Sequence, residues 1–303
     1  MVQSGSAGAS LTEMAPAKIN LTLTVCGRRR DGYHQLESLV VFADSAASDT
    51  IDLVVGGPLH LELLGPGAAA LAGEAISSNL VMRAAVAVLQ MVPRAETGTF
   101  RLQKHLPVAA GIGSGSADAA AALRLMRRAN PNLADSIDWA SLAATIGADV
   151  PVCLANRASL MWGLGERVAP LLELPAVWVV LANPRVPLST ADVFRTLSAS
   201  SLPFDQEAAE TLPTIPRFAN LADLITFITR RPNDLEAPAK QLCPIIREVQ
   251  LRLADLDGAL LARMSGSGPT CFALFATANA AHDGARRLAV SRPDWWVQAA
   301  GVV

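Results

Sequence analysis

One stretch of the 303-residue chain, residues 106–122, restricts the possible folds more than any other. Gly111, Gly113 and Gly115 carry no side chains, so the backbone N–H groups between them can turn toward one point. The alanine-rich run that follows favours a helix, with Ser116 as its expected N-cap and Asp118 in its first turn. A loop of this kind at a helix N-terminus is typical of a phosphate site. A plain strand-to-helix turn fits the same glycines, so the spacing alone leaves both interpretations open.

Two common phosphate motifs do not match this stretch. The P-loop pattern ends in Gly-Lys-Ser/Thr, but no lysine lies between Gly111 and Arg124. The dinucleotide pattern G-x-G-x-x-G requires glycine at a position held by Ser116 or by Asp118, depending on the register. A dinucleotide-dependent oxidoreductase is therefore disfavoured.

Composition narrows the class of protein further. Apolar residues make up 51% of the chain and charged residues 17%, which is ample material for one large or two medium domains. The net charge of −2 argues against nucleic-acid binding through a basic face. The four cysteines are far apart in sequence and form no C-x-x-C pair, so they are expected to be reduced thiols in a reducing compartment. No apolar run reaches about 18 residues, so no membrane contact is expected.

The hydrophobic pattern predicts a mixture of strands and helices, an α+β fold. Strands are expected at residues 19–25, 36–42, 50–55, 59–64, 99–104, 150–155, 176–182, 260–264, 271–275 and 295–299. Helices are expected at residues 79–91, 116–128, 139–146, 221–229, 245–254 and 280–290. Residues 1–12 are interpreted as a disordered N-terminal extension, and residues 198–216 as a connection to which no role is assigned.

Several polar residues can carry chemistry, although each also has an ordinary structural explanation. Lys18 and Asn20 share one face of a predicted strand, opposite its apolar face, and a solvated face would explain both. Asp149 lies in the turn G-A-D-V-P, where it can bond its own backbone or, beside a lysine, accept a proton from a hydroxyl group. Tyr33 and His34 follow a hairpin turn and can either be surface residues or stack on and hydrogen-bond a flat heterocycle.

A second glycine turn, M-S-G-S-G-P at residues 264–269, lies between two predicted strands and by itself indicates a hairpin. Taken together, the segments P-A-K-I-N, P-x-x-x-G-I-G-S-G-S-A-D-A, G-A-D-V-P and M-S-G-S-G-P resemble the motifs of the GHMP small-molecule kinases, in the usual order. The resemblance spans about residues 15–275. The D-G-Y-H segment is similar to that of the members that phosphorylate a cytidine-diphosphate-linked methylerythritol in the non-mevalonate isoprenoid route.

This resemblance implies a fold and a set of roles. It implies a two-domain GHMP kinase fold, with a ribosomal-S5-domain-2-like N-terminal domain at residues 13–173 and a ferredoxin-like α/β C-terminal domain at residues 174–303. It also implies Asp149 as the catalytic base with Lys18 as its partner, and Tyr33, His34 and Phe194 as the residues that bind cytosine. Asn20 is expected to contact the rest of the substrate. The family's loop is usually richer in glycine, so Ala109, in a position that is often glycine, leaves the detailed loop conformation open.

The cofactors implied are ATP and Mg²⁺, with Ser116 near the metal. The residues expected to bind ATP are Asn79, Lys104, Pro107, Ala109, Ala110, Gly111, Ile112, Gly113, Ser114, Gly115 and Ser116. The second glycine turn, with Gly266, Ser267 and Gly268, is expected to complete the site from the C-terminal domain.

The expected reaction is phosphoryl transfer from ATP to the 2-hydroxyl of the methylerythritol unit, in the cytoplasm of a bacterium, by a monomer or weak homodimer. Two alternatives stay open. One is a kinase of the same family that acts on homoserine, mevalonate or a sugar. The other is a regulator that senses a nucleotide or sugar on the same scaffold, although Lys18 and Asp149 argue against it.

Overall fold

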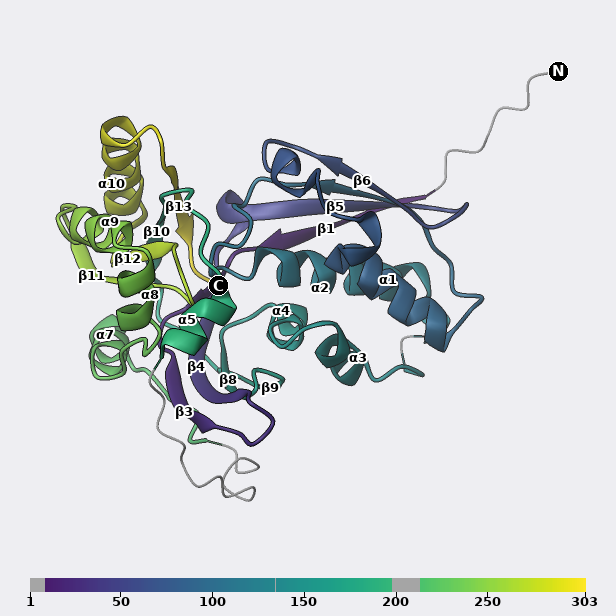
Figure 1. Cartoon of the computed structure of the whole chain (residues 1–303), viewed down its shortest axis with the longest axis horizontal. Coiled ribbons are helices and arrows are strands. Elements are labelled where there is room, and N and C mark those ends of the chain that lie inside the picture. Colours follow the sequence, from purple (N-terminus) through teal and green to yellow (C-terminus); the bar gives the residue numbers. More distant parts are fainter. Residues whose placement is uncertain (1–8, 134, 198–212) are drawn as a thin grey trace.

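The computed structural model describes residues 9–133, 135–197 and 213–303. Its strands form three sheets, and helices pack against them (Figure 1). The strands are β1 (Ser10–Pro16), β2 (Lys18–Asn20), β3 (Thr24–Arg28), β4 (His34–Phe42), β5 (Ser48–Val55), β6 (His60–Leu64), β7 (Gly98–Gln103), β8 (Ser159–Gly163), β9 (Arg167–Pro170), β10 (Trp178–Asn183), β11 (Ala259–Met264), β12 (Cys271–Phe275) and β13 (Trp296–Gly301). The α-helices are α1 (Leu80–Met91), α2 (Ser114–Ala129), α3 (Trp139–Ile146), α4 (Val150–Ala155), α5 (Thr190–Thr196), α7 (Leu221–Thr229), α8 (Glu236–Leu242), α9 (Ile245–Ala254) and α10 (Ala278–Ser291).

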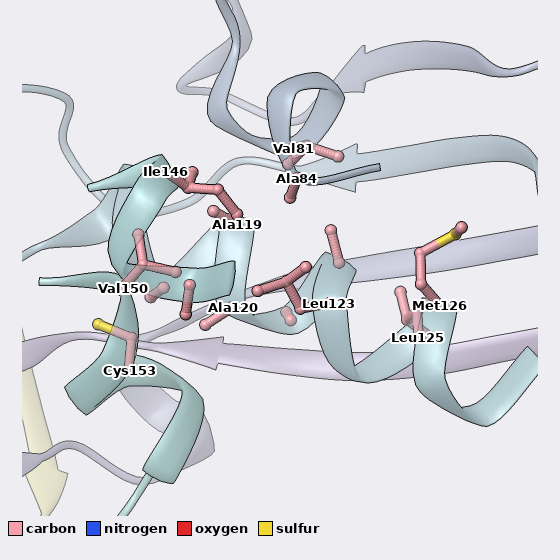
Figure 2. Packing of buried hydrophobic residues seen from close by; sticks show 14 of the residues in the cluster. Val81, Ala84, Ala119, Ala120, Leu123, Leu125, Met126, Ile146, Val150 and Cys153 are labelled. Atoms are coloured by element: carbon pink, nitrogen blue, oxygen red, sulfur yellow. The ribbon is translucent and has the colours of Figure 1, made fainter. Parts of the chain in front are cut away.

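The first sheet has the strand order β1-β5-β7-β6, and α2 lies along it with α1 beside it. The small residues of α2 explain this close packing, because Ala119, Ala120 and their neighbours leave room for larger side chains from both sides. Figure 2 shows this core, in which α2 contributes Leu123 and Met126 next to residues of α1, α3 and α4. The alanine-rich run thus makes α2 a central helix.

The second sheet is built around β4. Strands β2 and β3 pair with different parts of one side of β4, and β8 pairs with the other side, followed by β9. The break between β2 and β3 is fixed by side chains, since Thr22 Oγ1 accepts a hydrogen bond from Leu39 N and Ser38 Oγ donates to Thr22 O. A long β4 therefore carries residues from the buried centre of the molecule to an exposed hairpin.

The third sheet has the order β11-β12-β10-β13, and α8, α9 and α10 contribute to the apolar cluster on one of its faces. The last residue returns to the second sheet, where Val303 and Phe42 exchange two backbone hydrogen bonds. A second apolar cluster joins residues on both sides of position 173, including Ile19, Leu39 and Phe272. The division at residue 173 therefore stays a prediction.

Much of the predicted pattern is confirmed, and the α+β class with it. α7 and α9 begin and end at the predicted residues, as do α3 and β12. No helix in the part of the chain that the structure describes is long and apolar enough to cross a membrane. The predicted connection at residues 198–216 lies mostly outside the described residues, as do residues 1–8 of the predicted extension.

Four predictions about local structure are wrong. Residues 10–12 belong to β1 and pair with β5, so the N-terminal extension does not reach residue 12. The predicted strand at residues 150–155 is helix α4, in which Pro151 lies in the first turn, where proline needs no N–H partner. The single strand at residues 19–25 is divided into β2 and β3. α2 begins at Ser114 with Gly113 as its N-cap, so Ser116 lies inside the helix.

Candidate active site

Lys18 and Asp149, 131 residues apart in sequence, form an ion pair with 2.7 Å between Lys18 Nζ and Asp149 Oδ2. Lys18 lies in β2 and its side chain is 4% exposed, while the Asp149 side chain is 34% exposed. Asp149 is the N-cap residue of α4, but its carboxylate does not cap that helix. The carboxylate therefore has one face toward the lysine and one toward solvent, as a general base requires.

Two structural expectations for this region are wrong. Lys18 and Asn20 are buried and not solvated, because β2 is covered on both faces. A Cβ atom built on Gly113 would lie 3.1 Å from Lys18 Cε, so the glycine loop packs directly on the lysine. The Asp149 carboxylate binds Lys18 rather than its own turn.

The two glycine turns are in direct backbone contact. A Cβ on Gly111 would lie 2.6 Å from both Ser265 O and Gly268 N, and one on Gly266 would lie 2.6 Å from Gly111 O. Ser265 Oγ donates to Gly111 O at 3.0 Å and accepts from Asn20 N at 3.1 Å. Glycine is required at these positions because two backbones approach with no room for a side chain. The C-terminal half thus forms a wall of the phosphate loop.

The N-terminus of α2 is open toward this loop. Its N-cap residue, Gly113, has a φ of 61° and no side chain to cap the helix, so the first N–H groups are left for a ligand. Ser114, Gly115 and Ser116 line a cavity of about 290 Å³ together with Lys18 and Asp149. The same cavity contains Asn20, whose Oδ1 atom is buried without a hydrogen-bond partner in the structure. It also contains Ala109, Ala110, Gly111, Gly113, Gly266 and Ser267.

Aromatic residues gather at the other end of the cleft. Tyr33 and His34 lie at the β3–β4 hairpin, and the His34 ring stacks on Phe194 of α5 with 5.0 Å between ring centroids. Tyr33 is 65% exposed. Burial, and then the Arg28 guanidinium nearby, lower the pKa of His34 below its ordinary value.

A larger cavity of about 1130 Å³ joins these aromatic residues to the catalytic pair. It is lined by Tyr33, His34 and Phe194 at one end and by Ser116 and Asp149 at the other. The two cavities share five lining residues, which are Leu36, Ser116, Asp149, Thr190 and Phe194. One continuous cleft therefore runs from the glycine loop past Asp149 to the aromatic residues.

Four of the residues expected to bind ATP do not line this cleft. The Ile112 side chain is fully buried, although its backbone O accepts from Lys18 N. Pro107 lines a separate cavity of about 710 Å³. Asn79 is the N-cap of α1, with its Oδ1 accepting from Val81 N. Lys104 is 1% exposed, so the expected contact of its ammonium group with ATP is wrong.

The Lys104 ammonium group instead lies between two buried carboxylates, with 2.5 Å to Asp49 Oδ2 and 2.7 Å to Asp118 Oδ2. Burial alone would lower the pKa of Lys104, but Asp118 and Asp49 outweigh it and raise that pKa. Burial raises the pKa of Asp118 to about 7, against the opposing effect of Lys104. Asp118, expected in the first turn beside the anion site, therefore faces the core.

Sequence reasoning missed several residues of the cleft. Thr190 shares a hydrogen bond with Ser267 at 2.7 Å, which links α5 to the second glycine turn. Arg28 and Glu166 line the larger cavity. The G-R-R-R-D-G-Y-H segment placed Arg28 near the hairpin, and that was the available signal. Among the described residues, no group of three or more His, Cys, Asp or Glu side chains could hold a metal ion.

Comparisons with known proteins agree with this site. The model of the GHMP kinases N terminal domain matches residues 79–157, and that of the GHMP kinases C terminal domain matches residues 208–291. A protein of Rhodopseudomonas palustris (strain BisB5) named 4-diphosphocytidyl-2-C-methyl-D-erythritol kinase is 48% identical over 293 residues, covering 96% of this chain and 98% of the relative.

Solved structures give the same result. A crystal structure of 4-(cytidine 5'-diphospho)-2C-methyl-D-erythritol kinase is 32% identical with a TM-score of 0.71, covering 96% of this chain and 99% of that one. Mevalonate kinase of L. major in complex with R-mevalonate is 15% identical with a TM-score of 0.64, covering 99% and 98% of the two chains, and it shares the fold alone.

Proposed function

Since the chain belongs to the GHMP kinase family, we propose that it transfers the terminal phosphoryl group of ATP to the 2-hydroxyl of 4-diphosphocytidyl-2-C-methyl-D-erythritol. This reaction is a step of the non-mevalonate route to isoprenoid precursors. The observation that carries the proposal is the single cleft that joins Lys18 and Asp149 to Tyr33, His34 and Phe194. An acceptor alcohol and a flat base, the two ends of such a substrate, each meet fitting side chains there.

The catalytic pair acts on the acceptor hydroxyl. Asp149 accepts the proton as the hydroxyl oxygen attacks the terminal phosphorus of ATP and the bond to the bridging oxygen breaks, with ADP as the leaving group. Lys18 keeps the carboxylate oriented and offsets the negative charge on the transferring group. The loose transition state of phosphoryl transfer depends on such positioning more than on a strong base.

Asn20 is proposed to bind the same end of the substrate. Its Nδ2 donates to Ser38 Oγ at 2.7 Å, which fixes the amide. Its Oδ1 atom is buried and lacks a partner in the described chain, although a buried polar atom usually has one. A substrate hydroxyl that donates to this oxygen supplies the missing hydrogen bond.

The glycine loop is proposed to hold the ATP phosphates through its backbone N–H groups and the N-terminus of α2. Mg²⁺ binds one or two protein oxygens and otherwise phosphate oxygens and water, and Ser116 beside Asp149 fits that donor set. The ion would offset phosphate charge. For the loop, the close backbone packing leaves only main-chain donors at Gly111 and Gly113.

We also propose a place and an assembly state for the enzyme. Its four cysteines are all free, which fits the reducing cytoplasm of a bacterium. A monomer or weak homodimer is expected, because the cleft is built from one chain. Size-exclusion chromatography at micromolar and nanomolar concentrations tests the assembly state.

A substrate panel tests the function. Purified protein is incubated with ATP and Mg²⁺ and, in separate reactions, with 4-diphosphocytidyl-2-C-methyl-D-erythritol, mevalonate, homoserine and a hexose, and ADP release is followed. We expect turnover with the cytidyl substrate alone. Preferred turnover of another alcohol would assign the cleft to that substrate, and ADP release with none would contradict a kinase function.

The Asp149→Asn variant separates chemistry from binding. The amide keeps the size of the side chain but cannot take the proton, so turnover is expected to fall about a hundredfold or more. Nucleotide affinity should change little, because Asp149 does not belong to the glycine loop. Comparable turnover in variant and parent would remove Asp149 from the role of base.

A further inference from the structure

The phosphate loop begins and ends at one buried group of charges, Asp49, Lys104 and Asp118, here called the Lys104 cluster. Asp49 comes from β5, Lys104 follows β7, and Asp118 lies in α2. Their side chains are 0%, 2% and 4% exposed. Charges this deeply buried are costly unless each is paired, so a cluster of three needs a specific arrangement around it.

Asp49 binds the start of the loop. Its Oδ1 atom accepts hydrogen bonds from the backbone N–H groups of His105 and Leu106, at 2.5 and 2.8 Å. Its Oδ2 atom accepts from Lys104 Nζ. Both oxygens of one carboxylate are therefore occupied by the segment that leads directly into residues 107–113.

Asp118 binds the end of the loop into the same cluster. It lies in α2, just after the N-terminal residues that face the cleft, and its Oδ2 atom accepts from Lys104 Nζ at 2.7 Å. Lys104 is also enclosed from outside, since Gly67 N donates to Lys104 O and a Cβ on Gly67 would lie 2.8 Å from Lys104 Cγ. The ammonium group therefore joins the two ends of the loop without reaching the cleft.

We propose that the Lys104 cluster is a positioning unit for nucleotide binding, which fixes the start of the phosphate loop against the helix that ends it. Its carboxylates and ammonium group touch no substrate. They act through the backbone, by holding the loop N–H groups and the first turn of α2 in the arrangement that phosphates bind. This inference rests on the proposed function only for the identity of the acceptor, not for the binding of nucleotide.

Substitutions at Asp49 and Asp118 give opposite expectations for isosteric amides. Asp49→Asn must turn its NH₂ group either toward the loop N–H groups or toward Lys104, so one contact is lost whichever way it turns. Asp118→Asn keeps an oxygen for Lys104 and turns its NH₂ group to the position of Oδ1, which has no partner in the described structure. Asp118→Leu removes the connection to α2 altogether.

The experiment measures ADP affinity by calorimetry, KM for ATP, KM for the cytidyl substrate, and Tm. We expect Asp49→Asn and Asp118→Leu to weaken ADP binding and raise KM for ATP at least tenfold, with KM for the cytidyl substrate within twofold of the parent. Asp118→Asn should stay within threefold of the parent in all of these. If Asp49→Asn does not fold, the two Asp118 variants decide the question.

Asn130→Ala is the matched control. Asn130 is buried at the far end of α2 and joins Glu96 to Met126, so its loss loosens the same helix without touching the loop. We expect a lower Tm and unchanged ADP affinity. The proposal is overturned if Asp118→Leu lowers Tm but leaves ADP affinity unchanged, if Asp118→Asn and Asp118→Leu weaken binding equally, or if Asn130→Ala weakens it as much. A parent that binds ADP but ignores the cytidyl alcohol would contradict the proposed function and leave this test intact.

Discussion

At the scale of single residues, Ala109 and Gly111 occupy the same left-handed region of backbone space, with φ of 51° and 72°. An L-residue in that region costs roughly 1–2 kcal/mol. We expect Ala109→Gly to stabilise the protein by up to about 1 kcal/mol, since glycine relieves the strain and loses part of the gain to chain entropy. Urea unfolding of the variant measures the change.

Gly111→Ala should have the opposite effect, although the substitution is equally small. Its Cβ would enter the backbone contact with Ser265 and Gly268, and the left-handed φ adds its own cost. We expect a loss of about 2–4 kcal/mol in the free energy of unfolding. Equal effects of the two substitutions would contradict the close approach of the two turns.

His34 is expected to be neutral at pH 7, because burial and the Arg28 guanidinium lower its pKa below 6.5. A lowered pKa means that the unfolded chain binds this proton more readily, so acid below about pH 6.5 favours unfolding through His34. The Arg28→Gln variant should raise the His34 pKa. NMR titration of the ring protons, assigned with His34→Asn, measures both values. A pKa that does not move would exclude Arg28 as a cause.

At the scale of elements, the β3–β4 hairpin carries one ring of the proposed base site on its exposed turn. Tyr33→Ala should raise KM for the cytidyl substrate by an amount worth about 1–3 kcal/mol, the usual value of a base–aromatic stack. Tyr33→Phe keeps the ring and should retain most of the affinity. KM for ATP is the internal control, because the hairpin is separate from the glycine loop. An unchanged KM in Tyr33→Ala would contradict stacking on this ring.

The elements also show what the sequence can and cannot predict. The clear apolar spacing of α7 and α9 was sufficient to predict both helices with their ends. The run V-P-V-C-L-A of α4 reads as a strand because β-branched residues favour strands, while its burial against α2 and the turn at Asp149 make it a helix. β1 was missed because its pairing with β5 depends on residues about 40 positions away.

The site was predictable to the same extent. Motif order brought Lys18 and Asp149 together correctly, and their geometry is now observed. The depth of Lys104 was not predictable, because it depends on Asp49, 55 residues away, and on a glycine turn packed over its backbone. A motif identifies which residues meet, whereas burial decides which of their atoms a ligand can reach.

At the scale of the whole molecule, the four cysteines give a simple test of the packing. Cys26 is exposed, whereas Cys153, Cys243 and Cys271 are buried. Burial raises the pKa of Cys153 to about 12 and that of Cys26 to a smaller extent, so the native protein should release one equivalent of thionitrobenzoate slowly from a disulfide reagent. Four equivalents are expected after unfolding. The Cys26→Ser variant should show none while native, and rapid reaction of further thiols would contradict the described core.

The backbone contact between Gly111 and the Ser265–Gly268 turn has a consequence for recombination. Because the surface shared by the two halves contains main-chain atoms at its centre, no change of side chain can adapt one half to a foreign counterpart. A chimera that joins this N-terminal half to the C-terminal half of a distant kinase would need the donor's turn to follow the same path to within a fraction of an ångström. Nucleotide binding would then be the first property to fail in a mismatched hybrid, even if each half folded well.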